Sequence, residues 1–297
     1  MAKNSNLHAA KAAKNDEFYT LLTDIEKEMS YYKDFFKGKI VYCNCDDARE
    51  SNFFKYFSKN FEFLGLKKLI TTGYKAEGKG VVLVYEGDKN GNHKVEDNEI
   101  VVRELEGSGD FRSEECVEFL KEADVVVTNP PFSLFREYIK QLMDYGKKFL
   151  VIGSMNAITY KEIFPYIKDN ELWLGNQNVK EFRSPNGEIK KFGNILWYTN
   201  IQHKKRNTPL DLYKRYSNEY PKYDNYDAIE VSKVSDIPMD YDGVMGVPIT
   251  FLDKYCPEQF EILGHEHDID GKGGTINQFE INGKGTYKRI LIRKRNA

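Results

Sequence analysis

The stretch Asp124-Val125-Val126-Val127-Thr128-Asn129-Pro130-Pro131-Phe132 carries the strongest indication of fold in this chain. Its first five residues are Val-rich, which is typical of a buried strand in a parallel sheet. A rigid polar loop, residues 129–132, follows directly. In an open parallel sheet, ligands bind beyond the carboxyl ends of the strands. We therefore expect this loop to project into a binding site.

The loop of residues 129–132 offers clustered hydrogen-bond acceptors. Its two prolines fix the backbone and remove two amide donors, which leaves the Asn129 side-chain oxygen and the Pro130 carbonyl as acceptors. Two acceptors that hold the hydrogens of a planar amine would direct its lone pair toward an electrophile, while Phe132 stacks on the ring that carries the amine. An ordinary proline-rich turn is the alternative, but a strand before the loop and a helix after it favour function.

Strands and helices alternate on both sides of this loop. Apolar residues from Phe18 to Phe36 advance in steps of three and four, which predicts an opening helix. Buried strands are predicted at 40–42, 66–72, 148–153 and 171–174, and turn residues at 88–91 and 184–187 predict two hairpins. This order predicts an α/β fold with a doubly wound, mostly parallel sheet and helices on both faces. The pattern ends near Asn200, which predicts a catalytic domain over residues 1–200 and a second region over 201–297.

Composition limits the classes of function. The 297 residues are 40% hydrophobic and 30% charged, which indicates a globular chain. Without a long apolar stretch or a signal-peptide core, and with only four scattered cysteines, we expect a cytoplasmic protein with no membrane span. The net charge of -2 excludes a chain that coats nucleic acid by being basic throughout. Any DNA-binding surface must gather its positive charge on one face.

The turn Cys43-Asn44-Cys45-Asp46-Asp47 follows the first predicted strand, where doubly wound folds hold the adenosyl part of a cofactor. It contains no glycine, so a phosphate cradle of the G-x-G kind is not predicted. The small cysteines permit close approach of a ligand, and either aspartate can accept a hydrogen bond from an ammonium or hydroxyl group. The alternative places Cys43 and Cys45 in the core and makes the aspartates helix caps.

Two more polar segments are candidates for binding. Asp110 precedes a predicted helix, so it either accepts from an adenine amino group, with Phe111 lining the site, or caps the helix. The run His265-Glu266-His267-Asp268 has the residue types of a metal site. Because it lies between Gly264 and Gly271, a solvated turn is the better interpretation, and no metal is predicted.

A strand that ends in Asn-Pro-Pro-Phe resembles the catalytic motif of S-adenosylmethionine-dependent amino methyltransferases that act on nucleic-acid bases. Further segments are similar to the EcoRI-type adenine-specific DNA methyltransferases, and the similarity extends from about Asn15 to Arg293. These segments are Asn15-Asp16-Glu17-Phe18-Tyr19-Thr20, the Cys-Asp-Asp turn with Ser51-Asn52-Phe53, Gly109-Asp110-Phe111 and Gly246-Val247-Pro248-Ile249-Thr250-Phe251-Leu252.

The resemblance implies a role for each matching segment. Phe18, Tyr19 and Thr20 would contact the methionine end of the cofactor; Cys43, Asn44, Cys45, Asp46 and Asp47 would hold its amino-acid and ribose parts; Asp110 and Phe111 would meet its adenine; and Asn129, Pro130, Pro131 and Phe132 would bind the target adenine. Thr71 and Thr72 stand where many such enzymes have an acidic ribose ligand, so the ribose ligand is left open. The run Gly193-Asn194-Ile195-Leu196-Trp197 would add a base contact.

The implied activity is S-adenosylmethionine-dependent methylation of the adenine amino group at a specific sequence in double-stranded DNA, as in restriction-modification systems. The adenine would be flipped out of the duplex into the Asn-Pro-Pro-Phe site. One alternative is methylation of another planar amine, in RNA adenine, cytosine or protein glutamine. Another is a DNA-binding specificity module with a degenerate cofactor pocket. No feature of the chain identifies a partner nuclease.

Two basic runs beyond residue 200 are the predicted DNA contacts. Lys204, Lys205 and Arg206 follow the last predicted strand of the sheet, and Lys288 and Arg289 lie in a carboxyl-terminal stretch without acidic residues. Clustered cations of this kind neutralise phosphates. The alternative is a solvated surface. Sequence discrimination is expected in the irregular region of residues 207–285.

Overall fold

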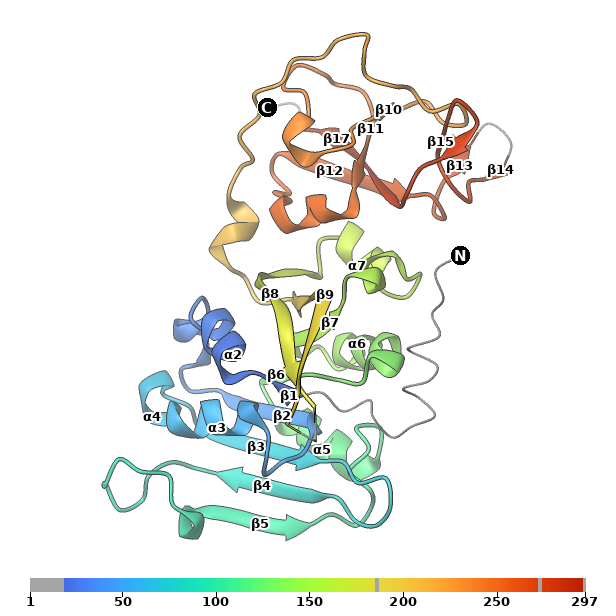
Figure 1. The fold of residues 1–297 in the computed structure, drawn as a ribbon. Coiled ribbons are helices and arrows are strands. Elements are labelled where there is room, and N and C mark those ends of the chain that lie inside the picture. The colour runs from blue at the N-terminus through green and yellow to red at the C-terminus, as the bar shows by residue number, and fades with distance from the viewer. Residues whose placement is uncertain (1–18, 185–186, 272–273, 296–297) are drawn as a thin grey trace. The chain divides into compact units, whose positions relative to one another are not determined.

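The computed structural model describes residues 19–184, 187–271 and 274–295 (Figure 1). The chain divides into two compact units, Met1–Ile163 with Leu174–Ile201, and Phe164–Trp173 with Gln202–Ala297. The sequence placed residues 164–173 with the first sheet, whereas the structure packs them with the second unit. Phe164 lies edge-on against His265 at 4.4 Å between ring centroids, and Trp173 lies under the guanidinium of Arg206 at 3.7 Å.

The first unit is built on a nine-stranded sheet with the order β1-β8-β9-β7-β6-β2-β3-β4-β5. Its central strands β7, β6, β2 and β3 are parallel, whereas β9 next to β7 and the pair β4–β5 next to β3 are antiparallel. The bounds are β1 (Tyr19–Thr20), β2 (Ile40–Asp46), β3 (Lys68–Gly73), β4 (Val81–Tyr85), β5 (Ile100–Glu104), β6 (Val125–Thr128), β7 (Lys148–Ser154), β8 (Trp173–Arg183) and β9 (Ile189–Thr199). The predicted α/β fold is confirmed, and so are the strands of both predicted hairpins.

Helices cover both faces of this sheet (Figure 1). Helices α2 (Leu22–Met29), α3 (Asn52–Lys59) and α4 (Phe61–Leu64) share a buried apolar cluster with one face, in which Phe53 and Phe57 pack with Val41 and Leu69. Helices α5 (Glu114–Glu122) and α6 (Phe135–Asp144) lie on the other face, where the Phe119 ring is 6.2 Å from that of Tyr42. The predicted opening helix is shorter than its apolar pattern, because the chain turns after Met29 and continues as a 3-10 helix, η1 (Lys33–Phe36).

The connection between β4 and β5 is a loop that is hydrogen-bonded to its own side chains. The Asp88 carboxylate accepts from the backbone N–H groups of Asn90, Gly91 and His93 at 3.1, 2.7 and 2.6 Å. A short 3-10 helix, η2 (Asp97–Glu99), then leads into β5. These bonds fix the turn that the sequence predicted at residues 88–91 and extend the sheet by two antiparallel strands.

The second unit contains a four-stranded sheet with the order β10-β11-β17-β12. These strands are β10 (Ile229–Glu230), β11 (Met245–Pro248), β12 (Phe260–His265) and β17 (Arg289–Lys294), accompanied by α7 (Phe164–Lys168) and by the 3-10 helices η5 (Lys204–Asn207), η6 (Val234–Asp236) and η7 (Ile249–Lys254). Two small hairpins, β13 (Asp270–Gly271) with β14 (Gly274–Thr275) and β15 (Glu280–Ile281) with β16 (Lys284–Gly285), lie between β12 and β17. Long irregular segments join these elements, as the sequence indicated.

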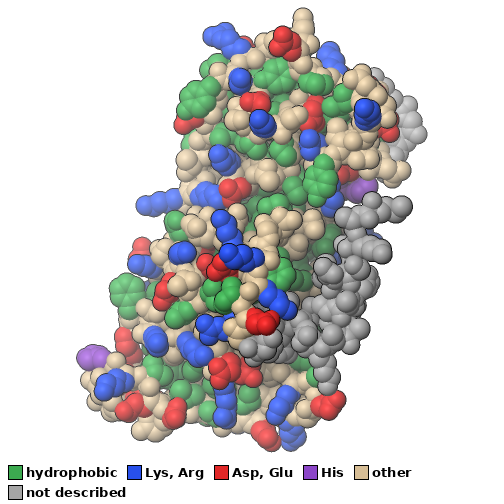
Figure 2. All heavy atoms as spheres, in the orientation of Figure 1, with side chains coloured by type: hydrophobic (Ala, Val, Ile, Leu, Met, Phe, Trp, Pro, Cys, Tyr) green, Lys and Arg blue, Asp and Glu red, His purple; other side chains and the backbone are tan. Residues whose placement is uncertain are grey.

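The surface carries both signs of charge. Figure 2 shows Lys and Arg side chains interspersed with Asp and Glu over the face that it draws. Within the described residues, no helix combines the length and the apolarity that crossing a membrane would demand.

Candidate active site

The predicted cofactor turn, residues 43–47, forms the bulged end of β2, because the strand continues to Asp46 and does not stop at residue 42 as predicted. A buried hydrogen bond joins this end of β2 to the start of the loop after β6. Strands β2 and β6 run parallel in register, with Tyr42 opposite Val126, so their carboxyl ends reach the same edge of the sheet. The Thr128 hydroxyl, which is fully buried, donates to the carbonyl oxygen of Asn44. The register therefore brings the predicted catalytic loop next to the predicted cofactor turn, although about 80 residues separate them in the chain.

The cofactor turn has a left-handed residue where a glycine would be expected. Cys45 has a φ of 64°, a conformation that non-glycine residues adopt only when their surroundings enforce it. The side chain of Asn44 is buried, and its Oδ1 accepts from the Tyr138 hydroxyl at 2.5 Å and from the Cys45 thiol at 3.4 Å. Asn44 therefore holds the turn from inside.

The aspartate of this turn that the structure describes in full, Asp47, faces solvent. Its Oδ1 accepts from the backbone N–H groups of Arg49 and Glu50 at 2.9 and 3.1 Å. The cap of α3 is Ser51, whose hydroxyl accepts from the Phe53 N–H at 3.1 Å. The capping role that the sequence left open for the aspartates thus belongs to Ser51, and Asp47 stays accessible at the edge of the sheet.

The amino-terminal segment reaches the same edge. Tyr19 and Thr20 form β1, which pairs with the end of β8, and the carbonyl oxygen of Thr20 accepts from the Asn52 side-chain amide at 2.7 Å. Because Asn52 begins α3 directly after the cofactor turn, this bond holds the two predicted cofactor segments together. Phe18, the third residue predicted in this segment, lies outside the described residues.

Asp110 is held by a guanidinium from its own loop. Arg112 donates to both carboxylate oxygens of Asp110, at 2.8 and 2.7 Å, and contacts Glu137 at 3.3 Å. These bonds hold the pKa of Asp110 below its usual range. The helix-cap interpretation of Asp110 is wrong, because Ser113 caps α5 by accepting from the Cys116 N–H at 3.3 Å.

Phe111 is buried under α6. Its ring lies edge-on to that of Tyr138, with centroids 4.9 Å apart and planes at 80°, and its carbonyl oxygen accepts from the Gln141 amide at 3.3 Å. The same tyrosine therefore contacts both predicted cofactor segments, the turn after β2 and the Asp110 loop.

Three glycines attach the Asp110 loop to the end of β3, and the sequence reading did not assign them to the site. A Cβ on Gly80 would lie 2.6 Å from the Gly73 carbonyl oxygen and 2.7 Å from that of Ser108. Gly109 has a φ of +82°, and a Cβ there would lie 2.4 Å from the same Gly73 oxygen. In the sequence, these glycines stand at the ends of predicted strands and directly before Asp110, which could have marked them as part of the site. Their contact with one another depends on the tertiary structure.

The predicted catalytic loop leads directly into α6. Asn129 is half-buried, Phe132 packs partly against the core cluster, and the Leu134 N–H donates to the Pro131 carbonyl oxygen at 2.9 Å. This 3-10 turn, η3 (Phe132–Leu134), is followed at once by α6, which begins at Phe135. The strand and the helix that the sequence predicted around the loop are both present.

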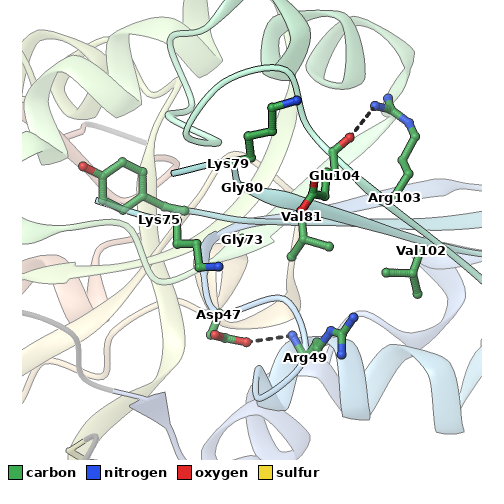
Figure 3. Close-up of a pocket in the computed structure, with 11 residues that line it drawn as sticks. Asp47, Arg49, Gly73, Lys75, Lys79, Gly80, Val81, Val102, Arg103 and Glu104 are labelled. Carbon is green, nitrogen blue, oxygen red and sulfur yellow. Dashed lines mark hydrogen bonds between the residues drawn. The ribbon is translucent and has the colours of Figure 1, made fainter. Parts of the chain in front are cut away.

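A cavity of about 450 Å³ opens beyond the carboxyl ends of β2 and β3 (Figure 3). Asp47 and Arg49 line one side of it, and Gly73, Lys75 and Lys79 line another. Four cationic side chains border this cavity: Arg49, Lys75, Lys79 and Arg103. The residues that follow β3 thus contribute to this edge, which the sequence did not indicate.

Several predicted residues instead face the interior. Thr71 and Thr72, considered for the ribose, are buried, and the Thr72 hydroxyl shares a hydrogen bond of 2.8 Å with that of Tyr42. Trp197, from the segment considered for a base contact, is fully buried and packs edge-on against Phe53 at 6.2 Å. These side chains support the sheet, because both β3 and β9 are covered on the faces that carry them.

The basic residues of the second unit differ in their availability. Arg206 is only 8% exposed, stacks on Trp173 and donates to the Gln202 side-chain oxygen at 2.9 Å. Arg289 contacts the buried Glu230 through Nε and NH2 at 2.7–3.0 Å. The prediction that these two guanidinium groups contact phosphate is therefore corrected, because both are held inside the unit.

The lysines of the same runs lie closer to solvent. Lys204 is exposed, Lys205 pairs with Asp253 at 2.5 Å, and Lys288 is half-buried. Exposed ammonium groups are the ones that can exchange a hydration shell for a phosphate. Of the predicted DNA contacts, Lys204 therefore remains the most accessible.

The first two residues of the histidine run, His265 and Glu266, are buried in the second unit, whereas His267 and Asp268 are exposed. His265 is buried against Phe164, burial lowers its pKa, and its Nδ1 accepts from the His267 N–H at 3.2 Å.

In the loop of residues 88–99, the side chains that carry oxygen atoms have the sequence spacing of calcium-binding loops. Within the described ranges, no group of three or more His, Cys, Asp or Glu side chains is arranged to hold a metal ion.

The comparisons with known proteins agree with this geometry. The model of the family described as adenine-specific methyltransferase EcoRI matches residues 6–295. The chain is 48% identical to the type II methyltransferase M.EcoRI of Escherichia coli, over 99% of this chain and 98% of the relative. It is 41% identical to M.MpnI of Mycoplasma pneumoniae, over 96% and 97%, and 38% identical to M.MgeORF184P of Mycoplasma genitalium, over 97% and 98%.

Proposed function

Because the chain belongs to the EcoRI family of adenine-specific methyltransferases, we propose that it transfers the methyl group of S-adenosylmethionine to the amino group of adenine at a specific sequence in double-stranded DNA. The observation that carries this proposal is the Asn129-Pro130-Pro131-Phe132 loop at the end of a parallel strand, tied through Thr128 to the turn after β2. The rest of the site follows from what surrounds this loop.

The residues at this edge of the sheet fit the methyl donor. The carboxylates of Asp47 and Asp110 are acceptors for the hydroxyl and amino groups of an adenosyl moiety, and the contact between Gly73, Gly80 and Gly109 keeps side chains away from the edge. The left-handed turn at Cys45 lets the backbone approach a ligand closely. When bound, the donor supplies an electrophilic methyl group on a sulfonium.

The catalytic loop would orient the adenine. The adenine must leave the duplex to reach the loop, at an unstacking cost of a few kcal/mol. The Asn129 oxygen and the Pro130 carbonyl would accept the two amino hydrogens, which directs the nitrogen lone pair toward the methyl group, and Phe132 would stack on the ring. No covalent intermediate with the protein is needed, so positioning and hydrogen bonding supply the rate enhancement.

The first prediction tests the role of Asn129. Asn129→Ala should retain affinity for S-adenosylmethionine but lower the rate of methyl transfer by roughly a hundredfold or more, because it removes an acceptor that acts in the transition state. Donor binding is measured by calorimetry and methyl transfer with labelled donor on separate DNA, RNA and protein substrates. Asn98→Ala, an exposed asparagine in η2, is the matched control and should behave as the unaltered protein.

Two outcomes would contradict the proposal. A near-normal rate in Asn129→Ala would remove this residue from the reaction. Methylation of RNA or protein in preference to double-stranded DNA would show that the planar amine belongs to another substrate.

We further propose that the second unit provides the DNA-recognition region, with Lys204 and Lys288 as phosphate contacts. The exposure of Lys204 supports this assignment, as does the accumulation of aromatic side chains in the unit. Its irregular segments, residues 207–285, would read the sequence.

A further inference from the structure

Tyr138 of α6 is a fully buried polar residue at the centre of the site. Its hydroxyl donates to Asn44 Oδ1 at 2.5 Å, and its ring contacts that of Phe111. Burial raises the pKa of Tyr138 well above its usual value, so its hydroxyl keeps its proton and remains a donor at every working pH. The hydroxyl can therefore donate to Asn44 over the whole working pH range.

The turn that Tyr138 contacts is strained. Cys45 has a φ of 64°, which brings its Cβ into conflict with the backbone, and such conformations persist only where neighbouring contacts enforce them. Three contacts converge on Asn44, the residue before it: the Tyr138 hydroxyl and the Cys45 thiol on its side-chain oxygen, and the Thr128 hydroxyl on its carbonyl oxygen. A glycine at position 45 would adopt the same conformation without enforcement.

We propose that Tyr138 is a positioning residue for the methyl donor, because its hydroxyl holds Asn44 and thereby keeps Cys45 in the left-handed conformation that shapes the donor turn. This inference rests on the proposed function, since it takes the turn after β2 as part of the donor site. Residue 138 lies six positions after Phe132, so the first turns of the helix that follows the catalytic loop also fix the donor turn. The donor site and the adenine site are thus built on one helix.

The test removes the hydroxyl and leaves the ring in place. Tyr138→Phe keeps the contact with Phe111 but leaves Asn44 Oδ1 without its strongest donor, so donor affinity should fall about tenfold, as expected for the loss of one buried hydrogen bond. The donor KM should rise by more than kcat falls. Tyr145→Phe, at the exposed end of α6, is the control and should leave donor affinity unchanged.

Rescue by glycine separates this role from general support of the fold. In the double variant Tyr138→Phe with Cys45→Gly, donor affinity should lie within about threefold of that of Cys45→Gly alone, because glycine needs no enforcement at this φ. Cys45→Gly alone is the reference for this comparison, and Cys45→Val should bind donor weakly, since a β-branched residue is strained most at positive φ. Cys45→Val decides the question even if Tyr138→Phe does not fold.

The outcomes are distinct. Unchanged donor affinity in a folded Tyr138→Phe, or in Cys45→Val, overturns the inference. The inference is also overturned if Tyr138→Phe loses donor affinity and the added Cys45→Gly does not restore it. The hydroxyl would then act on donor binding by a route other than the conformation of Cys45. If the unaltered protein binds no S-adenosylmethionine in calorimetry, the proposed function fails, whatever the variants do.

Discussion

The carboxylate of Asp110 has two roles. It is the proposed acceptor for the methyl donor, and it also accepts hydrogen bonds from Arg112. Both oxygens take part in the pair, and the side chains remain 27% and 45% exposed. An ion pair of this exposure contributes modestly to stability. Its main effect is to keep Asp110 ionised and to fix the direction of its oxygens.

The ionisation of Asp110 leads to a prediction about pH. The pKa of Asp110 is lowered by the Arg112 hydrogen bonds, so the pair stabilises the folded protein above the usual carboxyl pKa of about 3.9 and loses this contribution as pH falls through the lowered value. Arg112→Gln should therefore lower Tm slightly at pH 7, which corresponds to a loss of less than about 1 kcal/mol in the free energy of unfolding. The difference in Tm between the variant and the unaltered protein should shrink below about pH 4.

The control for this prediction is the same substitution in an Asp110→Asn background, where the pH-dependent difference should shrink to the contribution of the exposed Arg112–Glu137 contact. Thermal unfolding at several pH values measures both. If the Tm difference stays constant down to pH 3, Arg112 acts through its packing on the Phe111 ring, which lies 5.2 Å away, and not through the carboxylate.

At the scale of elements, backbone contacts hold the edge of the sheet together, because glycines let the end of β3 and the loop before Asp110 approach closely. The Gly80 N–H donates to the Gly107 carbonyl oxygen at 2.8 Å, and the Lys75 N–H donates to that of Ser108 at 2.8 Å. These bonds hold the loop before Asp110 against the ends of β3 and β4. The glycines therefore matter for where Asp110 and Phe111 stand, even though they offer no functional group.

A substitution at Gly80 tests this arrangement. Gly80→Ala would place a Cβ 2.6 Å from the Gly73 oxygen, so the loop must shift, at a cost of about 1–3 kcal/mol in stability and with weaker donor binding. Gly107→Ala is the matched control in the same loop: its Cβ would meet no described atom within 4 Å, and its φ is not positive. Denaturant unfolding measures the stability of the two variants, and calorimetry measures their donor affinity. If both variants behave alike, the close contact of Gly80 with the Gly73 oxygen does not position the Asp110 loop.

At the scale of the whole molecule, charge is divided between interior and surface in a way that net charge cannot reveal. Arg206 and Arg289 serve the interior of the second unit, the first on Trp173 and the second on Glu230. Lys204, two residues before Arg206, faces solvent. Neighbouring cations in one run thus have different physical roles.

This division predicts different effects for substitutions at Lys204 and at Arg206. Lys204→Ala should leave stability within about 0.5 kcal/mol and lower the salt slope of DNA binding by about one. Arg206→Ala should destabilise the protein by about 1–3 kcal/mol, because it removes a buried stacking contact, and should leave the salt slope unchanged where the protein is folded. DNA titrations at several salt concentrations, together with thermal unfolding, check both predictions. A lower salt slope in Arg206→Ala would show that Arg206 contacts a DNA phosphate.

Within residues 40–199, the sequence by itself determined the main elements and their order. The Val-rich run before Asn129, the alternation of strands with helices and both hairpin turns were predictable, because burial repeats at a fixed spacing in strands and helices and because turns need particular residues. The end of this alternation near residue 200 was the basis for the predicted boundary between residues 1–200 and 201–297. The return of residues 164–173 to the second unit could not be seen, since an apolar pattern does not identify the partner that buries it. Nor did the sequence predict the four-stranded sheet of that unit.

The tertiary structure decided which polar groups are free to act. Asn44 and Tyr138 are 94 residues apart, and their hydrogen bond exists because the register of β2 with β6 and the packing of α6 bring them together. The same holds for the contact between Gly73 and Gly109, for Trp197 on Phe53 and for Arg206 on Trp173. Local sequence sets the residues that can donate, accept or carry charge. Whether such a group faces a ligand or the core depends on long-range contacts that no local pattern contains.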